Sequence, residues 1–171
     1  GEQDVPQVVM VHDLRPLSHP GRSMQSLYFK FWVPPLLSQC RHILTNSNFT
    51  ASEILRATGV SEEKISVTPL GYDSDHFCQM NEYRRLHHRP YFLNIGQAYP
   101  HKNLKRLIQA FNAIASRYPE VDLLLLGKSH PVESKRLEQL ISHLGLSERV
   151  VFKCYVPYAA LPHWYRGALA F

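Results

Sequence analysis

No stretch of this sequence approaches the roughly 18 consecutive apolar residues that a membrane-spanning helix needs, although 44% of its 171 residues are hydrophobic. The polar first residues run straight into a strand-like VVMV, so we expect no secretory signal peptide. Cysteine is scarce: Cys40, Cys78 and Cys154 are far apart and form no C-x-x-C pair. This argues against a disulfide framework or a zinc knuckle, and favours a reducing, cytoplasmic setting.

Several catalytic signatures are also missing. The sequence contains no G-x-x-x-x-G-K-[ST], no G-x-G-x-x-G and no G-x-S-x-G, which argues against P-loop, ordinary dinucleotide and α/β-hydrolase chemistry. The ten histidines are scattered, and the one adjacent pair, in LHHR at residues 86–89, is interpreted as solvated surface. Asp73-Ser74-Asp75 spells D-x-D, but two carboxylates in a polar segment supply too few fixed oxygens for Mg²⁺ or Mn²⁺. We therefore expect no metal site and no cofactor.

The net charge is modestly positive. A formal charge of +5 and a sequence pI of about 9.2 suit anionic partners such as phosphates, nucleic acid or acidic lipid surfaces. A solvated basic surface without a specific partner explains the same excess equally well.

Apolar runs and amphipathic stretches alternate along the chain. Strands are expected in QVVMVHD, HILTNS, KISVTPLG, YFLNI, VDLLLLG and RVVF, with ALAF at the end opening one more. Helices are expected over residues 23–40, interrupted at residues 34–35 by two prolines, and over residues 53–59, 104–115, 133–145 and 158–168. Residues 15–21 are expected to form a loop. The alternation predicts α/β architecture built from right-handed βαβ units with parallel sheets.

Local signals set several of the expected boundaries. Thr50 and Glu53 form a capping-box pattern before the helix that Gly59 ends, and Asn103 stands at an N-cap position. Residues 72–90 are polar, charged and aperiodic, so they are interpreted as an interdomain linker between domains at 1–71 and 91–171. Because both ends fall inside a βα repeat, we expect a piece of a longer protein whose two domains are both incomplete.

Three strand-to-helix junctions are candidate binding sites, because ligands collect at the carboxyl ends of parallel strands. At residues 96–103, Gly96 allows close backbone approach, the helix start favours anions, and Lys102 adds a charge, so a phosphate or diphosphate is the expected guest. An ordinary βα loop with a solvated lysine is an equally good interpretation. Gly127-Lys128-Ser129 is more readily a plain turn, and His12, after the first strand, could be structural.

Read in order, these segments resemble the group 1 glycosyltransferases, also called family 4, which are retaining enzymes of the GT-B fold. The resemblance lies in VVMVHDLRPLSHP, in ILTNSNFTASEILRATGVSEEKISVTPLGYD, in YFLNIGQAYPHKNLKRLIQAF, in LLLLGK and in LGLSERVVFKCYVPYAALPHWYRGALAF. It covers essentially the whole chain. The family's N-terminal glycine-rich loop and its C-terminal E-x₇-E segment are absent from this sequence.

The resemblance implies two Rossmann-like domains, the acceptor-side domain first and the nucleotide-sugar donor domain second. It implies transfer of a hexosyl group, such as mannosyl or glucosyl, from a nucleotide-diphosphate sugar to a glycan or lipid-linked acceptor, although the piece alone is expected to be inactive. His12 is then expected near the transferred sugar, with Gly96, His101, Lys102 and Asn103 at the donor. The family's usual arginine is replaced by His101, which weakens that half of the phosphate clamp and makes it sensitive to pH. The family's usual glycine is replaced by Cys154, a departure that concerns only a turn.

Two other functions stay open at this point: a GT-B nucleotide-sugar epimerase, and a non-catalytic basic module that binds nucleic acid. The second is disfavoured because the basic residues are dispersed and the densest group, Arg84, Arg85 and Arg89, falls in the expected linker. A cytoplasmic location is expected. Peripheral contact with the inner membrane face is allowed, because lipid-linked acceptors are common in the family and the charge is positive.

Overall fold

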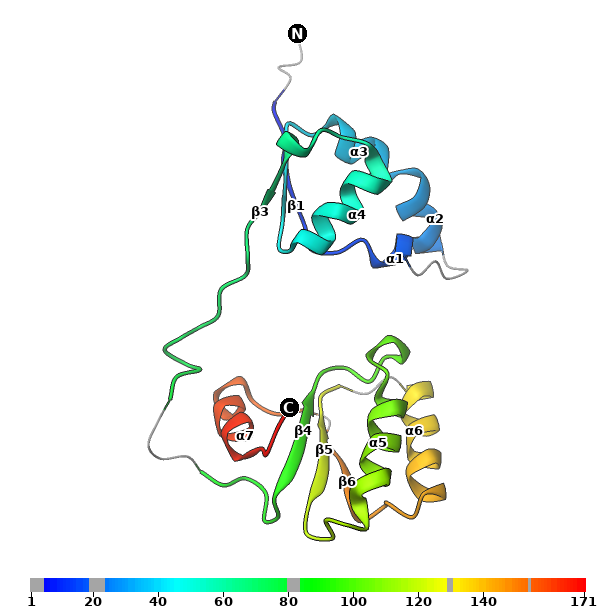
Figure 1. The fold of residues 1–171 in the computed structure, drawn as a ribbon, viewed down its shortest axis with the longest axis vertical. Coiled ribbons are helices and arrows are strands. Elements are labelled where there is room, and N and C mark those ends of the chain that lie inside the picture. Colours follow the sequence, from blue (N-terminus) through cyan, green and yellow to red (C-terminus); the bar gives the residue numbers. More distant parts are fainter. Residues whose placement is uncertain (1–4, 19–23, 80–83, 129–130, 154) are drawn as a thin grey trace. The chain divides into compact units, whose positions relative to one another are not determined.

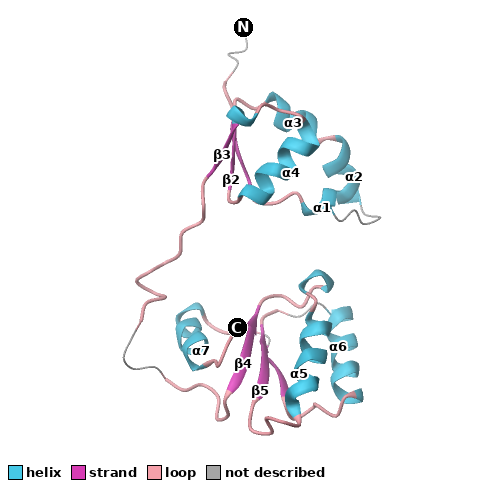
Figure 2. Ribbon diagram, in the orientation of Figure 1, coloured by secondary structure: helices cyan, strands magenta, loops and turns pink. Residues whose placement is uncertain are grey.

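The computed structural model describes residues 5–18, 24–79, 84–128, 131–153 and 155–171. The chain divides into two compact units, residues 1–72 (unit 1) and residues 73–171 (unit 2). Each unit carries a parallel three-stranded sheet with helices against it (Figures 1 and 2). The α/β class and the two parallel sheets predicted from the sequence are confirmed.

Unit 1 is built around the strand order β1-β2-β3. Its elements are β1 (Val8–Val11), α1 (Arg15–Ser18), α2 (Met24–Phe31), α3 (Val33–Gln39), β2 (His42–Thr45), α4 (Asn48–Thr58), the 3₁₀ turn η1 (Glu62–Lys64) and β3 (Ile65–Val67). The strands pair in parallel, with Val9 opposite Ile43 and Ile43 opposite Ile65. The three strands predicted for this half are therefore present.

The core of unit 1 lies on one face of this sheet. Val11 and Ile43 point from the strands toward Leu37 of α3 and Ile54 of α4. The alternate side chains face the other way, and Val8 remains 59% exposed. The first strand was expected to be a buried parallel strand; it is parallel, but it is buried on one face only because the described helices cover only that face.

Three helix boundaries differ from the sequence prediction. Residues 15–18, expected as loop, form the single-turn helix α1, and residues 19–21 of that loop lie outside the described residues. The two prolines were expected to interrupt a helix, but they occupy the first turn of α3, and the break falls at Trp32. A proline is well suited to the first turn because its missing N–H has no intrahelical partner there. The N-cap of α4 is Ser47, whose side chain accepts a hydrogen bond from the Thr50 amide at 3.2 Å, so the predicted Thr50 capping box was wrong.

Unit 2 has the strand order β4-β5-β6. Its elements are β4 (Tyr91–Ile95), η2 (Pro100–Lys102), α5 (Leu104–Ala115), β5 (Asp122–Leu126), α6 (Pro131–His143), β6 (Val150–Lys153), η3 (Tyr158–Ala160) and α7 (Leu161–Gly167). On the outer side of β4, Ala170 forms an isolated parallel bridge with Phe92, so ALAF pairs with β4 at one residue but is not a strand. The other strands and the helices predicted for this half are present.

The sheet of unit 2 is covered on both faces. Leu123 and Leu125 of β5 pack toward α5 and α6, where the predicted stripe supplies Ile108 and Phe111. The alternate residues of the strands pack toward Trp164 of α7. All five residues of β5 are buried, as expected for a central parallel strand with helices on both sides.

Parts of the expected linker belong to unit 2. His76 stacks on Tyr158 with ring centroids 4.2 Å apart, and its Nε2 lies 3.0 Å from the Tyr158 carbonyl oxygen. At the other end of the segment, His87 and Arg89 contact Asp122 at the start of β5. Residues 73–79 and 84–90 therefore pack against the second sheet unit.

Candidate functional site

The carboxyl ends of the strands in unit 2 meet at an edge where two glycines lie in contact. Gly96 follows β4 and donates its N–H to the Leu126 carbonyl at 2.9 Å, while Gly127 follows β5 and donates to the Lys153 carbonyl at 2.9 Å. A Cβ on Gly127, which has φ +139°, would lie 2.2 Å from the carbonyl oxygen of Gly96. A Cβ on Gly96 would meet nothing within 4 Å. The space beside Gly96 is open. Gly127 is the residue whose lack of a side chain lets the turn after β5 lie against the backbone of the turn after β4.

The loop after Gly96 leads into α5 through the short η2 turn, seen above α5 in Figure 1. The Lys102 N–H donates to the Tyr99 carbonyl at 2.9 Å, and the Asn103 N–H donates to the Pro100 carbonyl at 3.1 Å. Tyr99 and His101 stack with ring centroids 5.6 Å apart. These contacts hold His101 and Lys102 immediately before the helix.

Asn103 is the N-cap of α5, as expected, but it does not cap in the usual way. It has φ +56° and ψ +34°, the one non-glycine residue of the described chain with positive φ. Asparagine tolerates this left-handed conformation better than most residues. Its side chain makes no capping hydrogen bond. The side-chain amide is therefore available to a ligand at the N-terminal end of α5.

The start of α5 gathers positive charge. Lys102, Lys105 and Arg106 are exposed, and the first turn of α5 contains no acidic residue. Among the described residues, no carboxylate pairs with any of these three cations. Cations at a helix N-terminus oppose the helix dipole, so they raise the positive potential that an anion would meet there. The sequence analysis did not identify Lys105 and Arg106 as candidate site residues. The signal that could have found them is the absence of Asp and Glu from residues 83–119.

The two other candidate junctions, at His12 and at Gly127, bring together fewer potential ligand-binding groups. His12 and Asp13 follow β1 in unit 1 and are exposed; the carbonyl of His12 accepts a hydrogen bond from the Thr50 hydroxyl at 3.3 Å. Asp13 accepts from the Arg15 amide at 3.0 Å. His12 thus belongs to a different unit from Lys102, and its predicted place beside a sugar stays a prediction. Lys128 is exposed after Gly127, and Ser129 lies outside the described residues.

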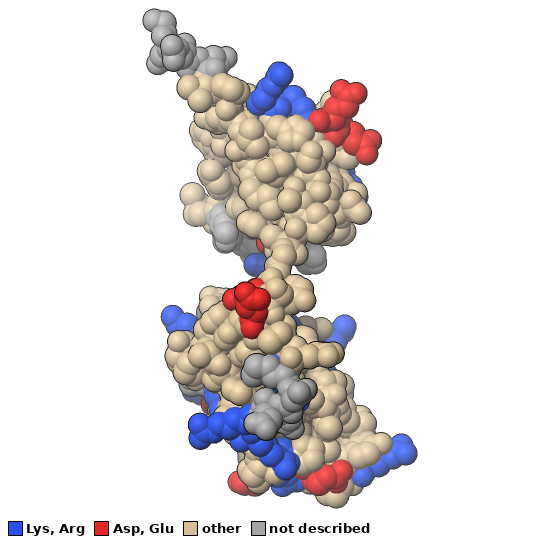
Figure 3. All heavy atoms as spheres, turned by 90° about the vertical axis from the view of Figure 1, so that its left-hand side faces the viewer, with Lys and Arg blue, Asp and Glu red and all other residues tan. Residues whose placement is uncertain are grey.

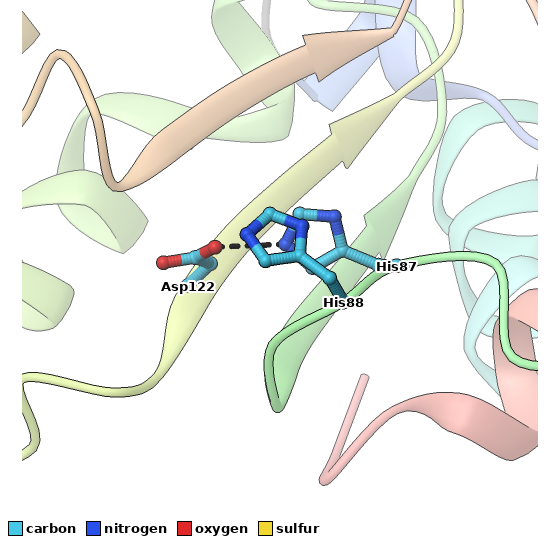
Figure 4. A group of neighbouring side chains, drawn as sticks. All are labelled: His87, His88 and Asp122. Carbon is cyan, nitrogen blue, oxygen red and sulfur yellow. Dashed lines mark hydrogen bonds and ion pairs between the residues drawn. The ribbon is translucent and has the colours of Figure 1, made fainter.

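One group of potential metal ligands is found in the described part of the chain: His87, His88 and Asp122, drawn in Figure 4. The Asp122 side chain is 2% exposed, and its carboxylate oxygens lie 2.7 Å from His87 Nε2, 3.1 Å from Arg149 Nε and 3.2 Å from Arg89 Nε. Two guanidinium groups already neutralise this carboxylate and would repel a divalent cation. The cluster is therefore an ion-pair network that fixes residues 87–89 to β5.

The interpretation of the His–His pair as solvated surface is corrected by this network. His88 is exposed, but the His87 side chain is only 9% exposed, because the carboxylate of Asp122 gives its ring a polar partner. The sequence places His87 and Asp122 35 residues apart, so no local pattern signals their contact.

The D-x-D segment forms a turn. Asp73 accepts a hydrogen bond from the His76 amide at 3.1 Å, and its other oxygen lies 3.4 Å from the Tyr158 hydroxyl. Desolvation, together with the negative charge of Asp73 and its hydrogen bond, raises the pKa of Tyr158 above 10. Asp73 thus joins the start of unit 2 to η3.

On the face shown in Figure 3, Lys and Arg lie on both units, and several of them lie side by side on unit 2. Within the described residues, no helix has the length and apolar character needed to cross a membrane. Cys40 is buried and Cys78 exposed, and both are free thiols, whereas Cys154 lies outside the described residues.

Family models match nearly the whole sequence. The model described as "Glycosyl transferases group 1" matches residues 79–171, and the model described as "Glycosyltransferase Family 4" matches residues 2–76. The first alone covers more than half of the chain. The chain belongs to the group 1 glycosyltransferases. The resemblance seen in the sequence is confirmed.

Two curated relatives of this group 1 glycosyltransferase chain are mannosyltransferases. The O-antigen chain mannosyltransferase RfbU of Salmonella typhimurium is 30% identical over 164 residues, which is 96% of this chain and 44% of the relative. The GDP-mannose-dependent alpha-(1-6)-phosphatidylinositol monomannoside mannosyltransferase of Mycolicibacterium smegmatis is 30% identical over 123 residues, which is 68% of this chain and 31% of the relative. The chain thus spans less than half the length of the curated relatives it matches.

Solved structures agree on the fold. HepE of Anabaena, crystallised with UDP and glucose, superimposes with a TM-score of 0.80 at 20% identity, over 95% of this chain and 44% of HepE. WaaG, a glycosyltransferase involved in lipopolysaccharide biosynthesis, superimposes with a TM-score of 0.74 at 15% identity, over 96% of this chain and 50% of WaaG. The two parallel-sheet units are those of the GT-B fold.

Proposed function

We propose that the protein transfers a hexosyl group, such as mannosyl or glucosyl, from a nucleotide-diphosphate sugar to a glycan or lipid-linked acceptor with retention of configuration. Family membership supports a transferase, and the mannosyltransferase relatives favour a hexosyl donor. One of those relatives acts, by its name, on a phosphatidylinositol monomannoside, which supports a lipid-linked acceptor.

The observation that carries the proposal is the cationic, uncapped start of α5. Lys102, Lys105 and Arg106 stand there with no carboxylate partner in the described chain. They follow the loop that begins at Gly96, beside which the space is open. A diphosphate brings two or more negative charges and several acceptor oxygens, so it matches this group of donors. A neutral sugar alone would leave these cations uncompensated.

The proposed roles follow from the chemistry of donor cleavage. As the bond between sugar and diphosphate breaks, negative charge grows on the leaving phosphate oxygens. The ammonium of Lys102 and the N-terminal dipole of α5 would stabilise that charge in the transition state more than in the ground state. His101 would add a ring N–H donor, and Asn103 a hydrogen-bonding amide. His12, from the other unit, would donate to a hydroxyl of the transferred sugar.

Titration calorimetry with GDP and UDP tests the phosphate role. Replacement Lys102→Ala removes one charge-assisted contact, and such contacts contribute about 1.5–3 kcal/mol. The Kd should therefore rise about 10- to 100-fold for the diphosphate that binds.

The matched control is Arg117→Ala, which removes one exposed cation just beyond the C-terminal end of α5. It changes the net charge equally but should leave the Kd within about twofold, because the charge is remote and solvated. Equal Kd values for the wild type and Lys102→Ala would contradict the proposed site.

A further inference from the structure

The loop that carries His12 leaves β1 at the point where the pairing of the sheet ends. Val11 is the last residue of β1 and pairs with Thr45 of β2. Val11 and Leu14 are buried in the core of unit 1, whereas His12 and Asp13 between them are exposed. The core therefore holds this loop on either side of two exposed residues.

The ring of His12 has no partner of its own among the described residues: none of them forms a hydrogen bond, an ion pair or a ring contact with it. The neighbouring carboxylate is already used, because Asp13 accepts a hydrogen bond from the Arg15 amide at 3.0 Å. The rotamers open to a side chain depend on its backbone conformation. The orientation of the His12 ring consequently depends on whatever holds the His12 backbone.

The carbonyl of His12 is held from another element. Thr50 lies in the first turn of α4 and is only 4% exposed. Its hydroxyl donates to the His12 carbonyl oxygen at 3.3 Å, across 38 residues of sequence. His12 lies beyond the last paired residue of β1, so this hydroxyl supplies a donor where the sheet no longer does.

Ser47 fixes the direction of the Thr50 hydroxyl. The Ser47 hydroxyl accepts the Thr50 amide at 3.2 Å and donates to the Thr50 hydroxyl oxygen at 3.0 Å. Because that oxygen already accepts one proton, its own proton is directed to the His12 carbonyl. Hydrogen bonds linked in this way polarise one another and become stronger. The two hydroxyls thus connect the N-cap of α4 to the peptide of His12.

We propose that Thr50 is a positioning residue, whose hydroxyl holds the His12 peptide so that the ring meets the transferred sugar in one orientation. This inference rests on the role given to His12 under the proposed function. Thr50 is buried and acts through His12, without touching the sugar itself. A group displaced by about 1 Å from its working geometry can lose about 100-fold in rate. Loss of the hydroxyl should therefore lower turnover far more than donor binding.

Two replacements of Thr50 separate its hydroxyl from its methyl group. Thr50→Val keeps the branched shape and removes the hydroxyl, whereas Thr50→Ser keeps the hydroxyl and removes the methyl group. Thr58→Val is the matched control in the same helix, because the Thr58 hydroxyl donates to the Ile54 carbonyl at 2.7 Å, within α4 itself. Urea denaturation checks that each variant is folded under the conditions of the assays.

Steady-state kinetics of the full-length protein test the effect on transfer. Thr50→Val should lower kcat about 10- to 100-fold. The KM for the donor should stay within about twofold, because the contacts of the diphosphate are unchanged. Thr50→Ser should restore most of the lost turnover, and Thr58→Val should behave like the wild type.

A double-mutant cycle separates positioning from a general structural role. In a His12→Ala background, Thr50→Val should cost no further turnover, because the ring that it positions is already missing. A full additional loss in that background would overturn the proposal, since Thr50 would then act on something other than His12.

The ring of His12 also gives a readout that does not need activity. In the chain labelled with ¹³C in its histidine rings, the His12 signal is the one missing from His12→Ala. Thr50→Val should shift or split that signal, while Thr50→Ser and Thr58→Val leave it in place. An unchanged signal in Thr50→Val overturns the proposal. If the signal responds as expected but the wild type transfers no sugar, the proposed function fails and the anchoring of His12 stands.

Ser47→Gly gives a second test if Thr50→Val does not fold. Glycine is well tolerated at an N-cap, so α4 should persist. The Thr50 hydroxyl would lose the donor that directs its proton, and the His12 signal should move as in Thr50→Val but by less. An unmoved signal in folded Ser47→Gly would contradict the proposed link between α4 and His12.

Discussion

At Gly127 the space that a side chain would need is already filled by the carbonyl oxygen of Gly96. The residue therefore does more than end β5. It allows the turn after β4 to lie against the turn after β5, and the turn after β4 is the one that continues to Lys102.

Replacement Gly127→Ala should both destabilise the fold and disturb the proposed diphosphate site. The new methyl group would have to move the Gly96 carbonyl from 2.2 Å to a normal contact distance, and alanine would be strained at φ +139°. We expect a loss of about 1–3 kcal/mol in the free energy of unfolding, measured by urea denaturation.

Gly71→Ala is the matched control, because a Cβ there meets nothing within 4 Å. It should change the free energy of unfolding by less than about 0.5 kcal/mol. Equal stability of the two variants would show that the Gly96 turn yields without cost.

His101 gives the second test at this scale. Arginine carries a permanent charge and a planar fork of five N–H donors, whereas a histidine ring offers at most two N–H donors. His101→Arg should therefore tighten nucleoside-diphosphate binding by a few-fold, measured by titration calorimetry. An unchanged Kd would mean that the side chain at this position takes no part in binding.

At the scale of single elements, the strong periodic signals were reliable, whereas the short-range signals were reliable only in part. The stripe of α5 and the apolar run of β5 were predicted correctly because burial against two layers dictates both patterns. Gly59 ends α4 in the left-handed conformation, as predicted. The single-turn helix α1 has no periodicity to detect, and two serine or threonine residues three apart both fit an N-cap, so the sequence did not distinguish Ser47 from Thr50.

The corrected cap predicts the effect of one substitution. Ser47→Ala removes the acceptor of the Thr50 amide, so the free energy of unfolding should fall by about 1 kcal/mol in a denaturant titration. Ser61→Ala is a suitable comparison, since Ser61 precedes η1 without a side-chain capping bond. If the two variants lose the same stability, the Ser47 hydroxyl is not acting as a cap.

The candidate site was only partly visible in the sequence for a related reason. Gly96 and Lys102 were found because both lie in the one short run of sequence between the end of β4 and the start of α5. The contact between Gly96 and Gly127 joins residues from two strands, and the pairing of His87 with Asp122 depends on how a connecting segment folds back. Such contacts follow from tertiary packing, which no short window of sequence contains.

At the scale of the whole molecule, Asp122 fastens the segment before β4 to the second sheet. Its carboxylate lies within 3.2 Å of His87, Arg89 and Arg149. Asp122→Asn would leave two guanidinium groups without a counter-charge, and disrupting a buried ion pair commonly costs about 3–5 kcal/mol. We expect a large loss of stability and faster amide hydrogen exchange in residues 84–90.

Asp75→Asn is the control, because Asp75 is exposed and its side chain has no described ion pair. Both changes remove one negative charge, so a difference in hydrogen exchange between them reports the network and not the net charge. Unchanged exchange in residues 84–90 of Asp122→Asn would mean that contacts other than this ion-pair network hold the segment.

The fastening of residues 73–79 and 84–90 to unit 2 has a mechanical consequence. Of the chain between the two sheets, residues 69–72 are exposed and belong to no helix or strand. Any swivel of one sheet unit against the other would then be concentrated in the backbone torsions of these four residues. A stiffer segment at these positions, or one lengthened by a few glycines, would change the rate of this rotation. The contacts within each unit would stay as they are.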